Sequence, residues 1–166
     1  MLRSSKHKDH GAMIAALFGI SRSPEWPKTQ KAHLKKEPHC VACRQRVNQL
    51  YGLQVHHIFP FHYCISLGRP DLELDQRNLI TLCETEAGHK ADNHHLLIGH
   101  LDDFESSNLS VSIDARKTFF GMTEAQIKSN PQWRMKKVKR LKPLDKMTAK
   151  DKGTFKALMN KIFPKK

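Results

Sequence analysis

Two adjacent histidines, His56 and His57, are followed 21 residues after His57 by Asn78 and then by a second histidine pair, His94 and His95. Imidazole is a common metal ligand and can also accept a proton near neutral pH. Consecutive residues of a strand point to opposite faces, so His56 and His57 cannot both ligate one ion. One ring then remains to take a proton from water. The pattern predicts metal-assisted hydrolysis.

Cysteines on either side of the first histidine pair indicate a second metal site. The spacing Cys40-x-x-Cys43 lets two thiolates reach one tetrahedral ion, and Cys83 supplies a third ligand. No cysteine follows, so the fourth ligand is His94 or His89. His94 is preferred because its neighbour on the same helix can then serve the other ion. We expect a structural zinc knuckle rather than reduced core thiols.

The 166 residues are enough for one compact domain with an appendage. Four cysteines without a recognisable secretory signal argue against a disulfide framework. They favour a reducing compartment, which we expect to be the cytoplasm. No apolar run of about 18 residues predicts a membrane-spanning helix. Cys64, in an expected helix, is predicted to be a buried small hydrophobe.

The net charge of +13 is unevenly placed. Residues 111–166 hold 16 Lys or Arg against 4 Asp or Glu, or +12, whereas residues 1–110 hold 13 against 12, or +1. Such a tail most often contacts a polyanion, and each phosphate contact adds salt dependence. We expect nucleic acid as the partner; the alternative is a solubilising tail. The candidate DNA contacts are Arg134, Lys136, Lys137, Lys139 and Arg140.

Periodicity and cap residues predict an α+β fold. The expected elements are a helix over 10–18, a helix from Ser23-Pro24 to about Lys36, a strand at Leu53–Ile58, a helix at Pro60–Leu67 closed by Gly68, an acidic loop at Asp71–Arg77, a strand at Leu79–Cys83 and a helix at Ala91–Leu101. In the helix that ends near Lys36, Trp26 and Ala32 are expected to face the core. His33 is expected at the surface, and His62 is expected to have no metal or catalytic role.

The basic tail is predicted to form helices. Thr123 and Thr148 begin capping-box sequences, and Asn130-Pro131 begins another helix. Sparse apolar stripes on these helices are expected to dock on the first domain rather than form a partner face. This divides the chain into a helical lead-in at 1–36, a catalytic domain at 37–110 and a basic helical tail at 111–166.

The joint pattern resembles a known family. Val55-His56-His57-Ile58-x-Pro60, then Leu74-Asp75-x-x-Asn78-Leu79-Ile80-x-Leu82-Cys83, then a helix-borne histidine, resembles the HNH endonucleases in their zinc-knuckle, phage and bacterial branch. The match covers residues 37–100. The resemblance implies a ββα-metal core, also called a His-Me finger.

The sequence departs from the family in three ways. His94 stands where the family commonly has a further cysteine, and the long gap between Cys83 and His94 carries Glu84, Glu86, His89 and Asp92 as further possible ligands. No third protein ligand for the catalytic ion is obvious. The resemblance also implies a bacterial or phage-infected cell.

The resemblance also implies a role for each residue. His57 would be the general base, and Asn78 would orient its ring through a hydrogen bond to the nearby backbone. His56 and His95 would ligate the catalytic ion, with His100 as a candidate third ligand. The ion would be Mg²⁺ or Mn²⁺, although imidazoles accept Zn²⁺, Ni²⁺ or Co²⁺ more readily. The substrate would be double-stranded DNA, contacted mostly at its backbone and hence with weak sequence preference.

Two other interpretations compete with the endonuclease. One is a non-catalytic zinc module that binds nucleic acid. The other is a phage packaging or assembly protein that uses a nuclease fold within a complex. His57 separates catalysis from a purely structural role: hydrolysis requires an uncoordinated ring that faces solvent, whereas a ring buried against hydrophobic neighbours argues against it.

Overall fold

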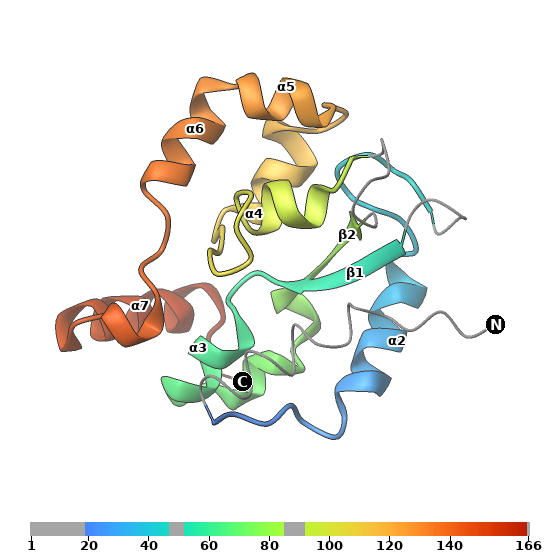
Figure 1. Cartoon of the computed structure of the whole chain (residues 1–166). Coiled ribbons are helices and arrows are strands. Elements are labelled where there is room, and N and C mark those ends of the chain that lie inside the picture. Colours follow the sequence, from blue (N-terminus) through green and yellow to red (C-terminus); the bar gives the residue numbers. More distant parts are fainter. Residues whose placement is uncertain (1–18, 47–51, 85–91, 166) are drawn as a thin grey trace.

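The computed structural model describes residues 19–46, 52–84 and 92–165, and its architecture is α+β (Figure 1). Two strands, β1 (Gly52–His57) and β2 (Leu79–Glu84), form an antiparallel sheet. The register pairs His57, the last residue of β1, with Leu79, the first residue of β2. Both strands lie close to their predicted positions.

Helical segments surround this sheet. The segments that precede or connect the strands, or follow β2 directly, are α2 (Trp26–Lys36), α3 (Phe61–Ser66), two 3-10 turns, η2 (Pro70–Glu73) and η3 (Gln76–Asn78), and the π-helical turn η4 (His95–Gly99). The loop predicted at Asp71–Arg77 therefore contains short helical turns. The predicted helix at Ala91–Leu101 is shorter than expected and is wound as a π-helix.

The C-terminal part contains α4 (Val111–Ile113), continued by the π-turn η5 (Asp114–Thr118), then α5 (Glu124–Ser129), α6 (Pro131–Val138), η6 (Leu144–Lys146) and α7 (Ala149–Ile162). Thr123 and Thr148 form the predicted capping boxes, and the Asn130 side chain caps α6. These caps satisfy backbone N–H groups that a helix start leaves without partners.

The tail completes two hydrophobic cores instead of forming a separate unit. Trp133 of α6 joins Ile80 and Leu97 in one core, while Phe155 and Met159 of α7 join the second, which is built on α3. In Figure 1, α5 and α6 lie above the sheet and α7 lies below it, beside α3. The expected docking of the tail on the rest of the chain is confirmed.

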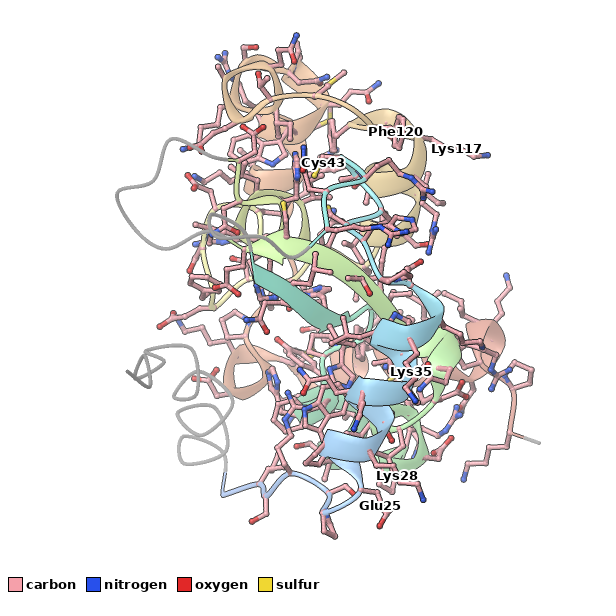
Figure 2. All side chains as sticks on the ribbon, turned by 90° about the vertical axis from the view of Figure 1, so that its right-hand side faces the viewer. Glu25, Lys28, Lys35, Cys43, Lys117 and Phe120 are labelled. Carbon is pink, nitrogen blue, oxygen red and sulfur yellow. The ribbon has the colours of Figure 1, made fainter. Side chains whose placement is uncertain are left out.

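Two side-chain expectations for α2 are wrong. Ala32 is exposed, whereas His33 is buried. His33 is buried because both of its ring nitrogens have polar partners. Nδ1 lies 2.9 Å from Gln76 Oε1 and Nε2 lies 3.3 Å from Glu37 Oε2, so this histidine joins α2 to the turn before β2. Figure 2 faces α2 and shows Lys28 and Lys35 on its outer side.

The helix over 10–18 lies outside the described residues. Within them, no helix has the length and apolar character needed to cross a membrane.

Candidate metal centres and the surroundings of His57

The four residues of the predicted zinc knuckle come together. Cys40 and Cys43 lie in the turn after α2, Cys83 lies on β2 and His94 directly precedes η4; one donor atom from each lies within 4.8 Å of the others. The Sγ atoms of Cys43 and Cys83 are 3.8 Å apart, and Nδ1 of His94 lies 3.2 Å from Cys83 Sγ and 3.8 Å from Cys40 Sγ. His89, the alternative ligand, lies outside the described residues.

These distances fit a tetrahedral zinc ion. Zn–S bonds of about 2.3 Å place two thiolates roughly 3.8 Å apart, and a thiolate and an imidazole roughly 3.6 Å apart. Hydrogen bonds from Cys43 and Cys83 lower the pKa of Cys40, which favours the thiolate form that binds metal. The Cys₃His cluster is therefore compatible with a structural zinc or another metal ion.

The tail supports this cluster from outside. Nε2 of His94 lies 3.1 Å from the carbonyl oxygen of Met122, which can only accept a hydrogen bond, so Nε2 carries the hydrogen. In the neutral ring, the lone pair on Nδ1 then points to the position between the three sulfur atoms. The Gly121 amide donates to the Ala42 carbonyl at 2.8 Å, within the turn between the two knuckle cysteines. The knuckle thus holds the chain that leads into α5.

A second cluster contains three histidines. His56 of β1, His95 at the start of η4 and His100 at its end place one nitrogen each within 4.8 Å of one another. All three side chains are buried. The structure therefore brings together the two expected metal ligands and the candidate third one.

The hydrogen bonds of two of these rings determine where their lone pairs point. Nδ1 of His95 lies 3.1 Å from Glu84 Oε2, and Nδ1 of His100 lies 2.8 Å from the carbonyl oxygen of Ser106. Because both partners accept, each Nδ1 carries a hydrogen, and in a neutral ring the lone pair is then on Nε2. The two Nε2 atoms are 3.3 Å apart. This is roughly the separation of two imidazole nitrogens on a tetrahedral ion with bonds of about 2.05 Å, so the donors fit a metal.

The π-winding of η4 aligns the two ligands. His95 and His100 are five residues apart, a spacing that an α-helix places on different faces but that the i to i+5 pattern of a π-turn stacks. Gly99 completes the arrangement: a Cβ atom built there would lie 3.1 Å from Cε1 and 3.2 Å from Nδ1 of His56. A glycine is needed for the ring of His56 to pack against η4.

His57 faces away from this cluster, toward α2 and α3. Its side chain is only 6% exposed, and its ring lies 4.6 Å from the ring of Trp26 and 6.0 Å from that of Phe61. Burial, together with the positive charge of Arg22, lowers the pKa of His57 to about 3. His57 belongs to neither of the two clusters of possible metal ligands, and the expectation that its ring faces solvent is wrong, because Trp26 at the start of α2 packs on it.

The surroundings of His57 fix its tautomer. Nε2 donates to the carbonyl oxygen of Glu73 at 2.9 Å, so the lone pair of the neutral ring is on Nδ1. Asn78 holds the chain just beyond this ring: its Oδ1 accepts from the Phe59 amide at 2.8 Å, and its Nδ2 donates to the carbonyls of Phe59 and Leu72 at 3.0 and 2.9 Å. Asn78 is fully buried and bonds to the backbone near the histidine, where the resemblance places it.

The candidate DNA contacts of α6 and the following turn are largely engaged with acidic residues. Lys136 pairs with Asp114 at 3.0 Å, Lys137 with Asp102 at 3.3 Å and Arg140 with Asp103 at 2.7 Å. The guanidinium of Arg134 donates to the Lys128 carbonyl. Among the described residues, no ion pair involves Lys139. The role of these residues in DNA binding stays a prediction.

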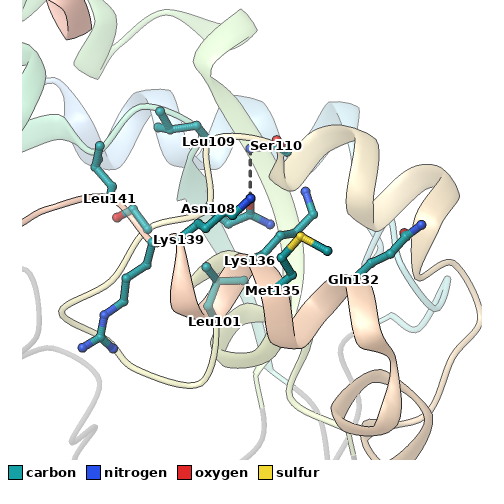
Figure 3. A pocket seen from close by; sticks show the side chains of 11 residues that line it. Leu101, Asn108, Leu109, Ser110, Gln132, Met135, Lys136, Lys139 and Leu141 are labelled. Carbon is teal, nitrogen blue, oxygen red and sulfur yellow. Dashed lines mark hydrogen bonds between the residues drawn. The ribbon is translucent and has the colours of Figure 1, made fainter.

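An open groove of about 410 Å³ runs beside α6 (Figure 3). Met135 and Lys136 lie on one side of it, and the loop around Leu109 and Ser110 on the other. Neither the Cys₃His knuckle nor the three-histidine cluster lines this groove.

Three residues near the site were not anticipated from the sequence: Gly99, Glu73 and Arg22. An isolated glycine in a helical pattern is a known sign of close packing, and could have drawn attention to Gly99. Nothing in the sequence indicates that Glu73 and Arg22 lie beside His57, because no local pattern records contacts between segments this far apart in the chain: Glu73 is 16 residues from His57, and Arg22 comes from the segment before α2.

Comparison of the chain with protein-family models, with curated proteins and with solved structures finds no match.

Proposed function

We propose that the protein is a metal-dependent DNA endonuclease of the HNH type, which hydrolyses phosphodiester bonds with one metal ion and His57 as the base. The observation that carries this proposal is the three-histidine cluster, which is separate from the Cys₃His knuckle. A site with three protein ligands leaves a coordination position for water or substrate, as catalytic metal sites do, whereas a four-ligand site is closed.

The chain's own residues have distinct tasks in this proposal. His56, His95 and His100 hold the ion, and Glu84 fixes the ring of His95 as carboxylates commonly do behind metal-bound histidines. A divalent ion held there supplies positive charge to a phosphate oxygen and offsets the charge that develops during hydrolysis. The imidazole donors favour a transition metal over Mg²⁺.

His57 is the proposed proton acceptor, and the burial that lowers its pKa to about 3 makes it a weak base until the ring is exposed to water. It is neutral at neutral pH, and the Glu73 carbonyl leaves the lone pair on Nδ1. Asn78 holds the backbone just beyond the end of β1, next to His56 and His57. Because Trp26 and Arg22 lie beside the buried ring, the proposal requires the Trp26 side chain at the start of α2 to shift enough for water to reach Nδ1. The phosphate then binds at the strand end, between the metal ligands and the base.

The test uses supercoiled plasmid with wild type, His57→Ala and His56→Ala, each assayed with Mg²⁺, Mn²⁺, Co²⁺, Ni²⁺ or Zn²⁺ and with chelator. We expect metal-dependent nicking by wild type and a loss of at least about 100-fold in each variant. Zinc content and circular dichroism of the variants serve as the control for folding. Equal cleavage by wild type and His57→Ala excludes His57 as the base.

One observation favours a second candidate function, a zinc-stabilised module that binds nucleic acid without cleaving it. The ring of His57 packs on Trp26 and Phe61 like a core residue. In this case, wild type would bind duplex DNA with a clear salt dependence but leave plasmid intact with every metal tested.

A further inference from the structure

Arg22 lies in the same aromatic cage as His57. The guanidinium carbon of Arg22 is 4.3 Å from the ring centroid of Trp26 and 3.9 Å from that of Phe61. These two rings are also the neighbours of the His57 ring, at 4.6 and 6.0 Å. The cage therefore places a fixed positive charge next to the proposed base.

The charge of Arg22 is only partly compensated. Its closest carboxylate oxygen, Oε1 of Glu73, lies 3.6 Å from Nη1, beyond hydrogen-bonding distance, and Nη1 is buried without a hydrogen-bond partner. The Glu73 carboxylate instead accepts from the Ser23 amide at 3.2 and 3.3 Å. By contrast, Arg69 and Arg77 bind their carboxylates at 2.7 and 2.6 Å. A half-buried guanidinium with one donor atom that lacks a hydrogen-bond partner can accept an anion.

We propose that Arg22 binds a non-bridging oxygen of the DNA phosphate that lies against His57. Guanidinium is the side chain best matched to phosphate because its planar fork donates two parallel hydrogen bonds, and stacking on Trp26 and Phe61 keeps this fork oriented. Its role in cleavage rests on the function proposed above, while its role in binding does not. Arg22 is 29% exposed, so the anion can approach from solvent.

The binding test uses a short DNA duplex and no added divalent ion. Arg22→Ala should lower the slope of log Kd against log salt concentration by about 0.9, the value for one phosphate contact. The matched control is Lys28→Ala, which removes the same charge from a side chain that is 86% exposed on α2. A slope for Arg22→Ala equal to that of Lys28→Ala overturns the proposal, and so does a wild type without salt-dependent binding.

The cleavage test separates charge from geometry. Arg22→Lys keeps the charge but loses the fork, so the salt slope should stay near that of wild type while kcat falls at least about tenfold and KM changes little. Arg22→Lys with wild-type kcat overturns the proposal for a cleaving enzyme.

If wild type binds DNA but cleaves none, the proposed function fails, and the salt slope of Arg22→Ala still decides whether Arg22 contacts phosphate. Arg22→Gln, which retains a polar side chain of similar length, replaces Arg22→Ala in the slope measurement if the latter does not fold.

Discussion

Nε2 of His95 faces Nε2 of His100 at 3.3 Å, although the Nδ1 atom of each ring already donates elsewhere. When both rings are neutral, two lone pairs face each other at this distance, an arrangement that a metal ion between them would stabilise. The three donors are buried, so the cluster could hold a metal ion away from bulk water. The three-histidine cluster is therefore sensitive to changes that move any of its rings.

Gly99→Ala should weaken metal binding at the three-histidine cluster and leave the zinc knuckle intact. The added methyl group would lie 3.1 to 3.4 Å from three atoms of the His56 ring and would push that ring from its position. We expect a loss of about 10-fold to 100-fold in affinity, as for other changes that misorient a metal ligand. Titration with Co²⁺, followed by absorbance, measures this affinity.

The matched control for this substitution is Gly153→Ala in α7. A Cβ atom at Gly153 meets nothing within 4 Å, so the change should leave metal affinity unaltered and stabilise the helix by about 0.5–1 kcal/mol. Equal cobalt affinity in both variants would show that the ring of His56 does not depend on Gly99.

Cys83→Ser should remove one zinc ion per chain and strongly destabilise the fold. The knuckle holds the end of β2, the start of η4 and, through the Met122 carbonyl, the chain leading into α5. We expect a loss of several kcal/mol, because structural zinc contributes directly to folding. Metal analysis and thermal unfolding measure both effects. Cys64→Ala is the control: this thiol lies in the other core, and burial raises its pKa to about 12, so zinc content should not change.

The sequence was sufficient to predict residues that act through fixed spacing. The Cys-x-x-Cys pair, the adjacent histidines on a strand and the capping boxes at Thr123 and Thr148 are local patterns with a direct geometric meaning, and the structure shows each of them. Asn78 also lies where a backbone bond near the histidine was expected.

The surroundings of His57 depend on contacts that no local pattern records. A strand ending in histidine predicts which face the ring takes but not what covers that face, and here Trp26 and Arg22 come from a segment about 30 residues earlier. His33 was missed for a similar reason: its partners Glu37 and Gln76 make burial of a polar ring favourable, and hydrophobic periodicity does not register such polar contacts.

Glu37 should make the stability of the protein depend on pH below about 5. Burial alone would raise the pKa of this carboxyl, but hydrogen bonds from His33, Arg116 and the Thr81 amide outweigh burial and hold it at about 2. The folded pKa is below the ordinary value of 4.5, so the ionised carboxylate stabilises the fold above that pH, and the contribution is lost as pH falls toward 2.

This contribution is about 3 kcal/mol near neutral pH and should fall by about 1 kcal/mol by pH 4. The measurement is the free energy of unfolding of wild type and Glu37→Gln in urea at several pH values. The gap between the two should narrow below pH 5. Glu25→Gln removes an exposed carboxylate next to α2 and should track wild type. A gap for Glu37→Gln that stays constant from pH 7 to pH 4 would contradict this assignment.

Deleting residues 111–166 should abolish folding rather than simply remove positive charge. The deletion takes Trp133 from one core, and Phe155 and Met159 from the other. Losing a single buried aromatic side chain costs about 3–5 kcal/mol, which approaches the whole stability of a domain of this size. Circular dichroism and hydrogen exchange of the shortened chain check this. A cooperatively folded fragment of residues 1–110 would show that the first part is an independent domain.

The contribution of the tail to DNA binding is therefore better measured with single substitutions. Lys139 is exposed, whereas the neighbouring Lys137 pairs with Asp102 at 3.3 Å and lies over the ring of Trp133. A lysine already paired within the protein gives up that contact when it binds phosphate, so its net contribution to DNA affinity is smaller. Lys139→Ala should reduce the salt slope of duplex binding by about 0.9, and Lys137→Ala by clearly less. Equal slopes for both variants and wild type would show that neither lysine contacts DNA phosphate.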